Sequence, residues 1–149
     1  MSLYSHPGAG WSVRHWRRGD YPQIEVIFRD CLKAFPWRRA ERDEIIRLRQ
    51  SLSANVAFVA EEKRAGVVGF LPLEHGQAYV PHVVVDRDWR LCGVGSGLLQ
   101  VARNFVGRPL QLDVDVQNEA AIEAYTALGW RERARVGRDR NEQVSLVGT

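Results

Sequence analysis

Residues 83–105 constrain the fold of this chain more than any other segment. A β-branched run at residues 83–85 leads through a polar turn into an apolar pattern with helical spacing. Between them lie three glycines at alternate positions: Gly93, Gly95 and Gly97. The order of strand, glycine loop and helix aims several backbone N–H groups and a helix N-terminus at one point, which binds anions and above all phosphates. We therefore predict a ligand that carries phosphate, with the guanidinium of Arg90 adding a charge-assisted hydrogen bond.

Several ligand classes use such glycine loops, and spacing separates them only in part. A Walker loop requires a lysine directly after its last glycine, and no lysine lies near Gly93. A dinucleotide-binding or S-adenosylmethionine-binding fold places an acidic residue about twenty positions after the glycines, where Asp113 stands. However, the stretch from Val85 to Gly93 is longer than a tight Rossmann turn, and the third glycine of G-x-G-x-x-G is absent. That class therefore remains a distant alternative.

A second motif, N-E-A-A-I-E-A-Y-T-A-L-G-W, covers residues 118–130. Together, R-x-x-G-x-G from Arg90 and N-x-x-A-x-x-x-Y-x-x-x-G-W from Asn118 resemble the GNAT superfamily of acyl-CoA-dependent N-acetyltransferases. The resemblance is good over residues 57–136 and loose over the segment before them. It implies one GNAT-like α/β (α+β) domain over residues 1–149. Its central mixed, mostly antiparallel sheet would have about six to seven strands and a V-shaped splay, with about four flanking helices.

The resemblance also implies roles for individual residues. In the family, the first motif binds the CoA pyrophosphate, and the second lines the pantetheine arm and presents a tyrosine near the thioester sulfur. Acetyl-CoA would then be the co-substrate, no metal would take part, and Tyr125 would be the general acid that protonates the departing thiolate. The backbones of Val83 and Val85 would pair with the pantetheine, with one N–H polarising the thioester carbonyl. The cofactor-binding residues implied in this way are Val83, Val85, Arg90, Leu91, Cys92, Gly93, Val94, Gly95, Ser96, Asn118 and Ala121.

Two residues are candidates for the general base, because an ammonium acceptor must lose a proton before it attacks. Glu74 precedes the strand expected at residues 77–85, and His82 lies within it. Both also have a plain structural interpretation, as a surface glutamate and a core histidine. Pro81 cannot donate a ladder hydrogen bond, so it predicts a bulge in this strand.

A metal site receives little support from the sequence. Asp113 and Asp115 share one face of a strand, but no third ligand follows at a useful spacing.

Hydrophobic periodicity and turn residues predict the remaining elements. A helix over residues 24–35 would begin with a capping box of Asp20 and Gln23 and end at Pro36. The aromatic residues and arginines at 35–39 are either a site for an acidic acceptor or an ordinary helix junction. The other expected elements are strands at 11–15, 56–61, 66–71, 110–116, 130–136 and 142–147, and helices at 40–52, 94–106 and 119–128.

Composition and charge narrow the class of protein. A chain of 149 residues is one domain by length, and it has no apolar run long enough to span a membrane. The N-terminus lacks the pattern of a secretory signal, and two cysteines make no disulfide framework. The net charge is +3, but the arginines are scattered, and those at 131–140 alternate as on a solvated strand face. We expect a cytoplasmic protein that binds neither nucleic acid nor membrane; a homodimer stays open.

These inferences predict an N-acetyltransferase that transfers the acetyl group of acetyl-CoA directly to a primary amine in a ternary complex. The alternative from another class is a non-catalytic acyl-CoA-binding or regulatory module. The acceptor stays open among small amines, amino acids, aminoglycosides, peptides and protein lysines.

Overall fold

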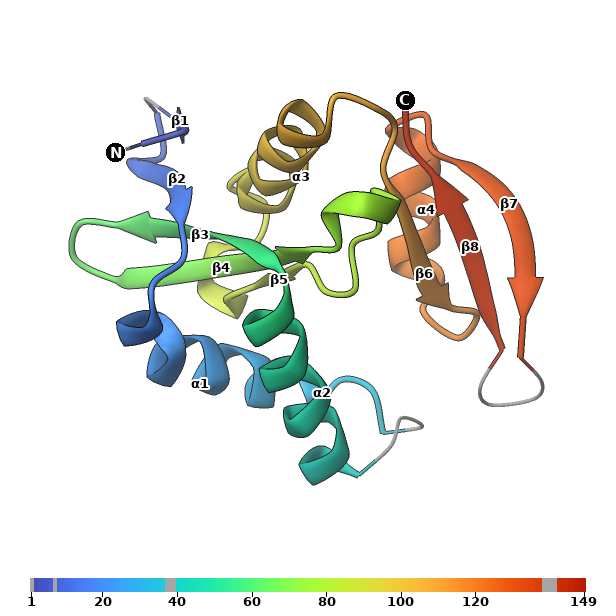
Figure 1. Cartoon of the computed structure of the whole chain (residues 1–149), viewed down its shortest axis with the longest axis horizontal. Helices are drawn as coiled ribbons and strands as arrows, with labels where there is room; N and C mark the ends of the chain where they lie inside the picture. Colours follow the sequence, from blue (N-terminus) through green and yellow to red (C-terminus); the bar gives the residue numbers. More distant parts are fainter. Residues whose placement is uncertain (1, 7, 37–39, 138–141) are drawn as a thin grey trace.

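The structure is a computed structural model that describes all residues except 1, 7, 37–39 and 138–141. Within the described residues, the strands form two antiparallel sheets and four α-helices flank them (Figure 1). The first sheet follows the order of the sequence: β1 (Tyr4–Ser5), β2 (Trp11–His15), β3 (Val56–Glu62), β4 (Gly66–Leu73) and β5 (Val84–Val85). The second runs β6 (Gln111–Asp115), β8 (Gln143–Val147) and β7 (Arg131–Val136). The helices are α1 (Tyr21–Leu32), α2 (Glu41–Ala54), α3 (Val94–Val106) and α4 (Glu119–Ala127).

Different helices cover the two faces of the first sheet, because successive side chains of a strand point to opposite sides. Phe58 and Ala60 of β3 pack in one buried cluster with α3, whereas Ala57 and Val59 pack in another with α1 and α2. Figure 1 shows α1 and α2 below this sheet and α3 above it. None of the helices in the described part of the chain combines the length and apolarity needed to cross a membrane.

The two sheets meet at a short backbone contact and then separate. The N–H of Val80 donates to the carbonyl of Gln111, and the N–H of Gln111 donates to the carbonyl of Ala78, both at 2.8 Å. Beyond this contact, β5 pairs with β4 and β6 pairs with β8, so β5 and β6 are not neighbours in a sheet. The two segments run parallel where Tyr79 bridges to Gln111, and all other strand pairs among the described residues are antiparallel. The expected mixed, mostly antiparallel architecture with a V-shaped splay is thus confirmed, as two sheets instead of one.

The strand expected at residues 77–85 is wrong in its extent. Residues 75–77 form a short 3-10 helix, η2 (His75–Gln77), and Ala78 adopts a left-handed conformation with φ of 51°. Pairing with β4 begins only at Val84. Pro81 has no N–H to donate, and the interruption that it predicted extends over most of the segment.

The predicted start and end of the first helix also need correction. Asp20 is the N-cap residue of α1, but its side chain makes no capping hydrogen bond. Gln23 instead accepts a hydrogen bond from the N–H of Val67 on β4, at 3.1 Å. The helix ends at Leu32, before Pro36, because the last residues close tighter turns, such as Phe35 N–H to Leu32 carbonyl at 3.0 Å.

Asp20 serves a buried ion network in place of the expected cap. Both of its carboxylate oxygens accept hydrogen bonds from Arg14 of β2 at 2.9 Å, and Arg14 also donates to Glu61 of β3. Burial would raise the pKa of Asp20, but the hydrogen bonds from Arg14 and from the backbone N–H of Arg17 outweigh it, so this pKa is lowered. The network joins the start of α1 to the first sheet.

We expect Asp20→Asn to lower the free energy of unfolding by about 3 kcal/mol at neutral pH, because it leaves Arg14 without its buried partner. Since the folded-state pKa of Asp20 is lowered, its contribution is full above the pKa of an unfolded aspartate and is lost as pH falls through the folded value. The difference between wild type and variant should therefore shrink in acid. Urea unfolding at several pH values measures both effects.

Asp30→Asn is the matched control, because it breaks an exposed pair with Arg87. It should cost less than about 1 kcal/mol. Equal losses in the two variants would contradict the importance assigned to the buried network.

Candidate functional site

The three glycines before and within α3 lie in different surroundings, so each position lacks a side chain for a different reason. Gly93 caps the helix with φ of +78°, a left-handed conformation that favours glycine. A Cβ on Gly97 would lie 2.3 Å from Cη2 of Trp11, so packing closes that position. A Cβ on Gly95 would meet Cγ2 of Val85 at 3.7 Å, an ordinary contact. Packing within the protein therefore does not require glycine at position 95. Because this residue has no side chain, the backbone of the loop stays accessible from the cavity that it lines.

The N-terminus of α3 borders a cavity of about 240 Å³. The first N–H groups of a helix have no acceptor within it, and Gly93 supplies no side-chain cap, so donors and the positive end of the helix dipole meet here. The cavity is lined by Val85, Trp89, Arg90, Leu91, Gly93, Val94, Gly95 and Ser96. All of these residues except Trp89 were expected at the site from the sequence. Cys92, which was also expected there, packs against the core instead.

Leu91 is unusual within this loop. Its backbone is left-handed, with φ of 66°, although it is not glycine, and its side chain is fully exposed. Such a conformation strains an L-residue and is typical of functional loops.

A second cavity, of about 140 Å³, lies in the splay between the two sheets. Helix α1 lines it with Phe28, Cys31, and Leu32, and Phe35 follows this helix. Helix α4 lines it with Ala121 and Tyr125, and Asn118 precedes that helix. The remaining lining comes from residues 80–84 and 112–114. Helix α1 packs in one buried cluster and α4 packs in the other, so the cavity lies between the two. We call this cavity the passage.

Tyr125 is half-buried beside the passage, and its ring lies 5.1 Å from that of Trp130. Burial raises the pKa of Tyr125 to about 12. The phenol therefore stays protonated throughout the neutral range, as a hydrogen-bond donor must.

The structure separates the two candidates for the general base. His82 lines the passage, and its ring packs edge-on against Phe28 at 5.3 Å. Glu74 is the N-cap residue of η2 and is not among the residues that line the passage; its backbone pairs with Tyr79.

A hydrogen-bonded carboxylate, which the sequence did not predict at this place, also borders the passage. Asp113 accepts hydrogen bonds from the hydroxyl of Tyr79, at 2.8 Å, and from Ser145. Burial, and next the bonded carboxylate of Asp113, raise the pKa of Tyr79. Asp115 accepts instead from Gln143 at 3.0 Å. Among the described residues, no three His, Cys, Asp or Glu side chains form a group that could hold a metal ion.

Asn118 has a structural role in addition to its place beside the passage. Its side-chain oxygen accepts a hydrogen bond from the N–H of Ala121, at 3.3 Å, and so caps α4. The residue also lines the passage, so capping and ligand contact are compatible. Trp37, Arg38 and Arg39, which the sequence suggested for an acceptor site, lie outside the described residues.

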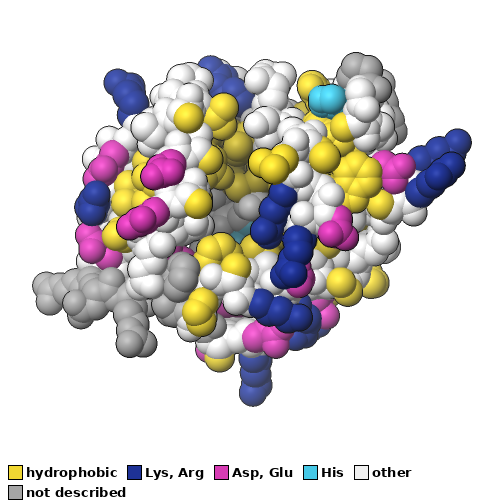
Figure 2. All heavy atoms as spheres, turned by 180° about the vertical axis from the view of Figure 1, so that it is seen from behind, with side chains coloured by type: hydrophobic (Ala, Val, Ile, Leu, Met, Phe, Trp, Pro, Cys, Tyr) yellow, Lys and Arg dark blue, Asp and Glu magenta, His cyan; other side chains and the backbone are white. Residues whose placement is uncertain are grey.

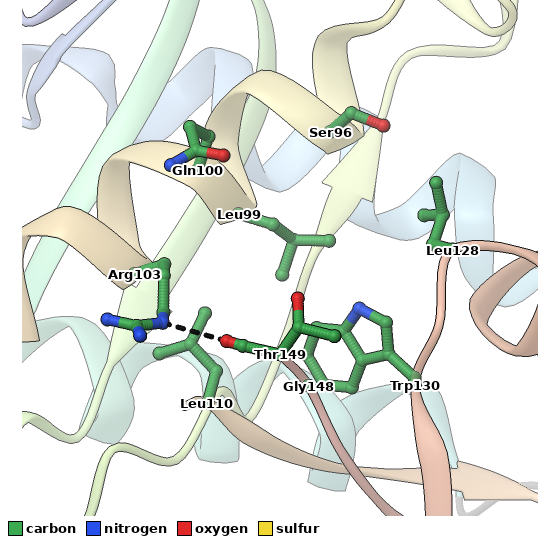
Figure 3. Close-up of a pocket in the computed structure, with 9 residues that line it drawn as sticks. All are labelled: Ser96, Leu99, Gln100, Arg103, Leu110, Leu128, Trp130, Gly148 and Thr149. Carbon is green, nitrogen blue, oxygen red and sulfur yellow. Dashed lines mark hydrogen bonds between the residues drawn. The ribbon is translucent and has the colours of Figure 1, made fainter. Parts of the chain in front are cut away.

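A third cavity, of about 180 Å³, lies between α3 and the end of the second sheet (Figure 3). Leu99, Leu110 and Trp130 give it apolar walls, while Arg103 donates to the carbonyl of Thr149 at 3.1 Å. Ser96 lines both this cavity and the one at the glycine loop, so the two adjoin. Figure 2 shows the face opposite to Figure 1, which is hollowed near its centre, with basic side chains along one side of the hollow.

Fold and site together define an α/β protein. It has a glycine loop of the kind that binds anions, next to the place where its two sheets separate. The model of the acetyltransferase (GNAT) family matches residues 11–130, and the chain belongs to this family. The resemblance inferred from the two motifs is thereby confirmed, and membership implies acyltransferase activity. No curated protein sequence matches the chain.

Solved structures share the fold. The apo form of YjaB from Escherichia coli is 27% identical, with 93% of this chain and 99% of that chain covered and a TM-score of 0.74. PH1933 from Pyrococcus horikoshii OT3 is 16% identical, with 93% and 97% covered and a TM-score of 0.74. Naa50 from Arabidopsis thaliana, in complex with the bisubstrate analogue CoA-Ac-MVNAL, is 18% identical, with 94% and 99% covered and a TM-score of 0.66.

We expect Gly95→Ala to weaken CoA binding about tenfold, because the new methyl group obstructs the approach of a ligand to the loop. The free energy of unfolding should hold or rise by up to about 1 kcal/mol, since alanine favours the helix. Calorimetric titration with CoA and urea unfolding give the two numbers. Gly97→Ala is the contrast, because its clash with Trp11 should cost about 2 kcal/mol of stability. Unchanged CoA affinity in Gly95→Ala would place the pyrophosphate elsewhere.

Proposed function

We propose that this protein is an N-acetyltransferase that transfers the acetyl group of acetyl-CoA to a primary amine by direct attack in a ternary complex. The observation that carries the proposal is the passage, which is lined from α1 on one side and from α4 on the other. A donor entering beside α4 and an acceptor entering beside α1 would meet inside it. The Naa50 complex with a bisubstrate analogue, in the same fold, supports simultaneous binding of this kind.

The glycine loop and the splay suit the two ends of acetyl-CoA. The pyrophosphate would lie at the N-terminus of α3, where Arg90 and the first-turn N–H groups supply donors. The pantetheine arm carries amide groups, and β5 is the last strand of its sheet, so the backbone near Val83 and Val85 is available to them. The thioester would then reach the passage, where Tyr125 lies.

Transfer requires two proton movements in addition to the exchange of bonds. A base removes a proton from the acceptor ammonium, and the amine nitrogen forms a bond to the thioester carbon. The carbon–sulfur bond then breaks as the nitrogen loses its second proton and the leaving sulfur gains one, which gives a neutral amide and a thiol. His82 is the base that we favour, because it lines the passage and Glu74 does not. Tyr125 would donate a hydrogen bond to the leaving sulfur. Its pKa, raised by burial to about 12, makes it a modest acid, so we expect it to assist without being indispensable.

The direct experiment measures thiol release from acetyl-CoA with a panel of small amines, amino acids, aminoglycosides and short peptides. Release with at least one amine, and mass-spectrometric detection of its acetylated product, supports the proposal. CoA binding without release for any amine would favour the alternative of a non-catalytic acyl-CoA-binding module. Binding of S-adenosylmethionine or NAD in place of CoA would contradict both.

Tyr125→Phe should lower kcat by about 10²-fold and leave CoA affinity near wild type, because the ring still packs against Trp130. Since the pKa of Tyr125 is about 12 and the protonated phenol is the active form, wild-type kcat should not fall through loss of this proton below about pH 10. The pH profile of kcat, with an accepted amine, measures this. A variant as active as wild type would exclude the assigned role.

The base can be identified from the low-pH limb of kcat/KM. A base must be deprotonated to act, so the rate rises with pH as the base loses its proton. We expect His82→Gln to abolish this rise and to lower kcat/KM by about 10²-fold, while Glu74→Gln keeps the wild-type profile. The opposite result would assign the role to Glu74, and an unchanged rise in both variants would exclude both residues.

A further inference from the structure

Trp11 connects the first sheet directly to the glycine loop. It is the first residue of β2 and only 1% exposed. Its indole N–H donates to the backbone carbonyl of Cys92 at 2.9 Å, across 81 positions of the sequence. Cys92 belongs to the loop, but it does not line the cavity there. The indole thus binds the loop on the side that faces the core.

This hydrogen bond fixes the direction of one peptide group. In a trans peptide the carbonyl and the following N–H point in opposite directions. Because the Cys92 carbonyl is turned inward to Trp11, the N–H of Gly93 is turned away from the core. Gly93 itself lines the cavity beside Arg90. The bond to Trp11 therefore turns a loop donor toward the side where an anion approaches.

Packing holds the indole in the place that this bond requires. Gly97 leaves room for it, since a Cβ there would lie 2.3 Å from Cη2 and 2.7 Å from Cζ3 of Trp11. The ring of Tyr4 on β1 stacks on Trp11 with centroids 5.4 Å apart, and the ring of His6 lies 5.3 Å away. The benzo edge of the indole fills space, while its N–H orients the loop. The two functions belong to different atoms and can be tested separately.

We propose that Trp11 is a positioning residue for CoA binding, which acts by orienting the peptide between Cys92 and Gly93 toward the pyrophosphate. The inference rests on the proposed function, because it takes the phosphate-bearing ligand to be CoA. It assigns a binding role to a buried residue that does not line the loop cavity. It also explains why position 97 has no room for a side chain although Gly97 does not line the loop cavity: the space is filled by Trp11.

The test uses the whole protein with CoA and with pantetheine, which lacks the pyrophosphate. Trp11→Phe removes the N–H donor and leaves an aromatic ring. We expect it to weaken CoA binding about fivefold, as for the loss of one hydrogen bond, with pantetheine binding unchanged. Trp16→Phe is the matched control, because Trp16 packs in the opposite core cluster. It should leave the affinities for both ligands at the wild-type level.

A double variant separates packing from orientation. In Trp11→Phe/Gly97→Ala the alanine methyl occupies part of the space left by the benzo edge, so thermal stability should recover relative to Trp11→Phe while CoA affinity stays low. Recovery of both would reduce Trp11 to a packing residue and overturn the proposal. If the phenylalanine variants do not fold, benzothienylalanine incorporated at position 11 keeps the indole shape without the N–H. CoA affinity at the wild-type level in that protein would also overturn the proposal.

Failure of the proposed function would look different. A wild-type protein that binds neither CoA nor pantetheine would remove the basis of both proposals. A wild-type protein that binds CoA with the same affinity as Trp11→Phe would remove only the role of Trp11.

Discussion

The short backbone contact between the two sheets is the interaction on which the remaining architecture depends. Ala78 and Val80 pair with Gln111, and after that point nothing forces β5 and β6 together. Pro81 follows at once and has no N–H with which to continue a ladder. The contact therefore fixes the narrow end of the splay, and the passage with Tyr125 and His82 lies in the part that opens. A regular ladder in the same place would have left no room for this cavity.

Local patterns in the sequence predicted the elements whose causes are local. The bounds of α3 match the apolar periodicity of residues 94–106, and the hairpin of β3 and β4 follows from two β-rich runs around a charged turn. The strand at residues 77–85 was wrong in its extent, because the interruption around Pro81 is longer than a single bulge. The capping box of Asp20 and Gln23 was wrong, because other partners bind both side chains. Asp20 accepts hydrogen bonds from Arg14 of β2, and Gln23 accepts one from the backbone of β4. Arg14 is only six positions from Asp20 but lies on a strand, and Val67 is 44 positions from Gln23, so the helical pattern by itself indicated neither partner.

The same distinction applies to the candidate site. The two motifs predicted the loop around Arg90 and the placement of Tyr125 on a helix, since their residue types and spacing carry that information. Which base candidate lies beside the passage required the fold, because Glu74 and His82 are close in sequence and differ in their surroundings. Trp11 and the pair of Tyr79 with Asp113 act over long sequence separations. One signal was present: Gly97 is a third glycine that the phosphate motif does not need.

The division into two sheets also bears on how the chain reaches this state. Every strand of the first sheet precedes every strand of the second, and α3 links the halves. Each sheet therefore forms from contiguous sequence, without threading or exchange of strands between halves. Loop closure within a contiguous segment costs less entropy than pairing of distant segments. During synthesis, every strand of the first sheet has been made before residues 111–147, and the passage arises only when the second half docks on the first.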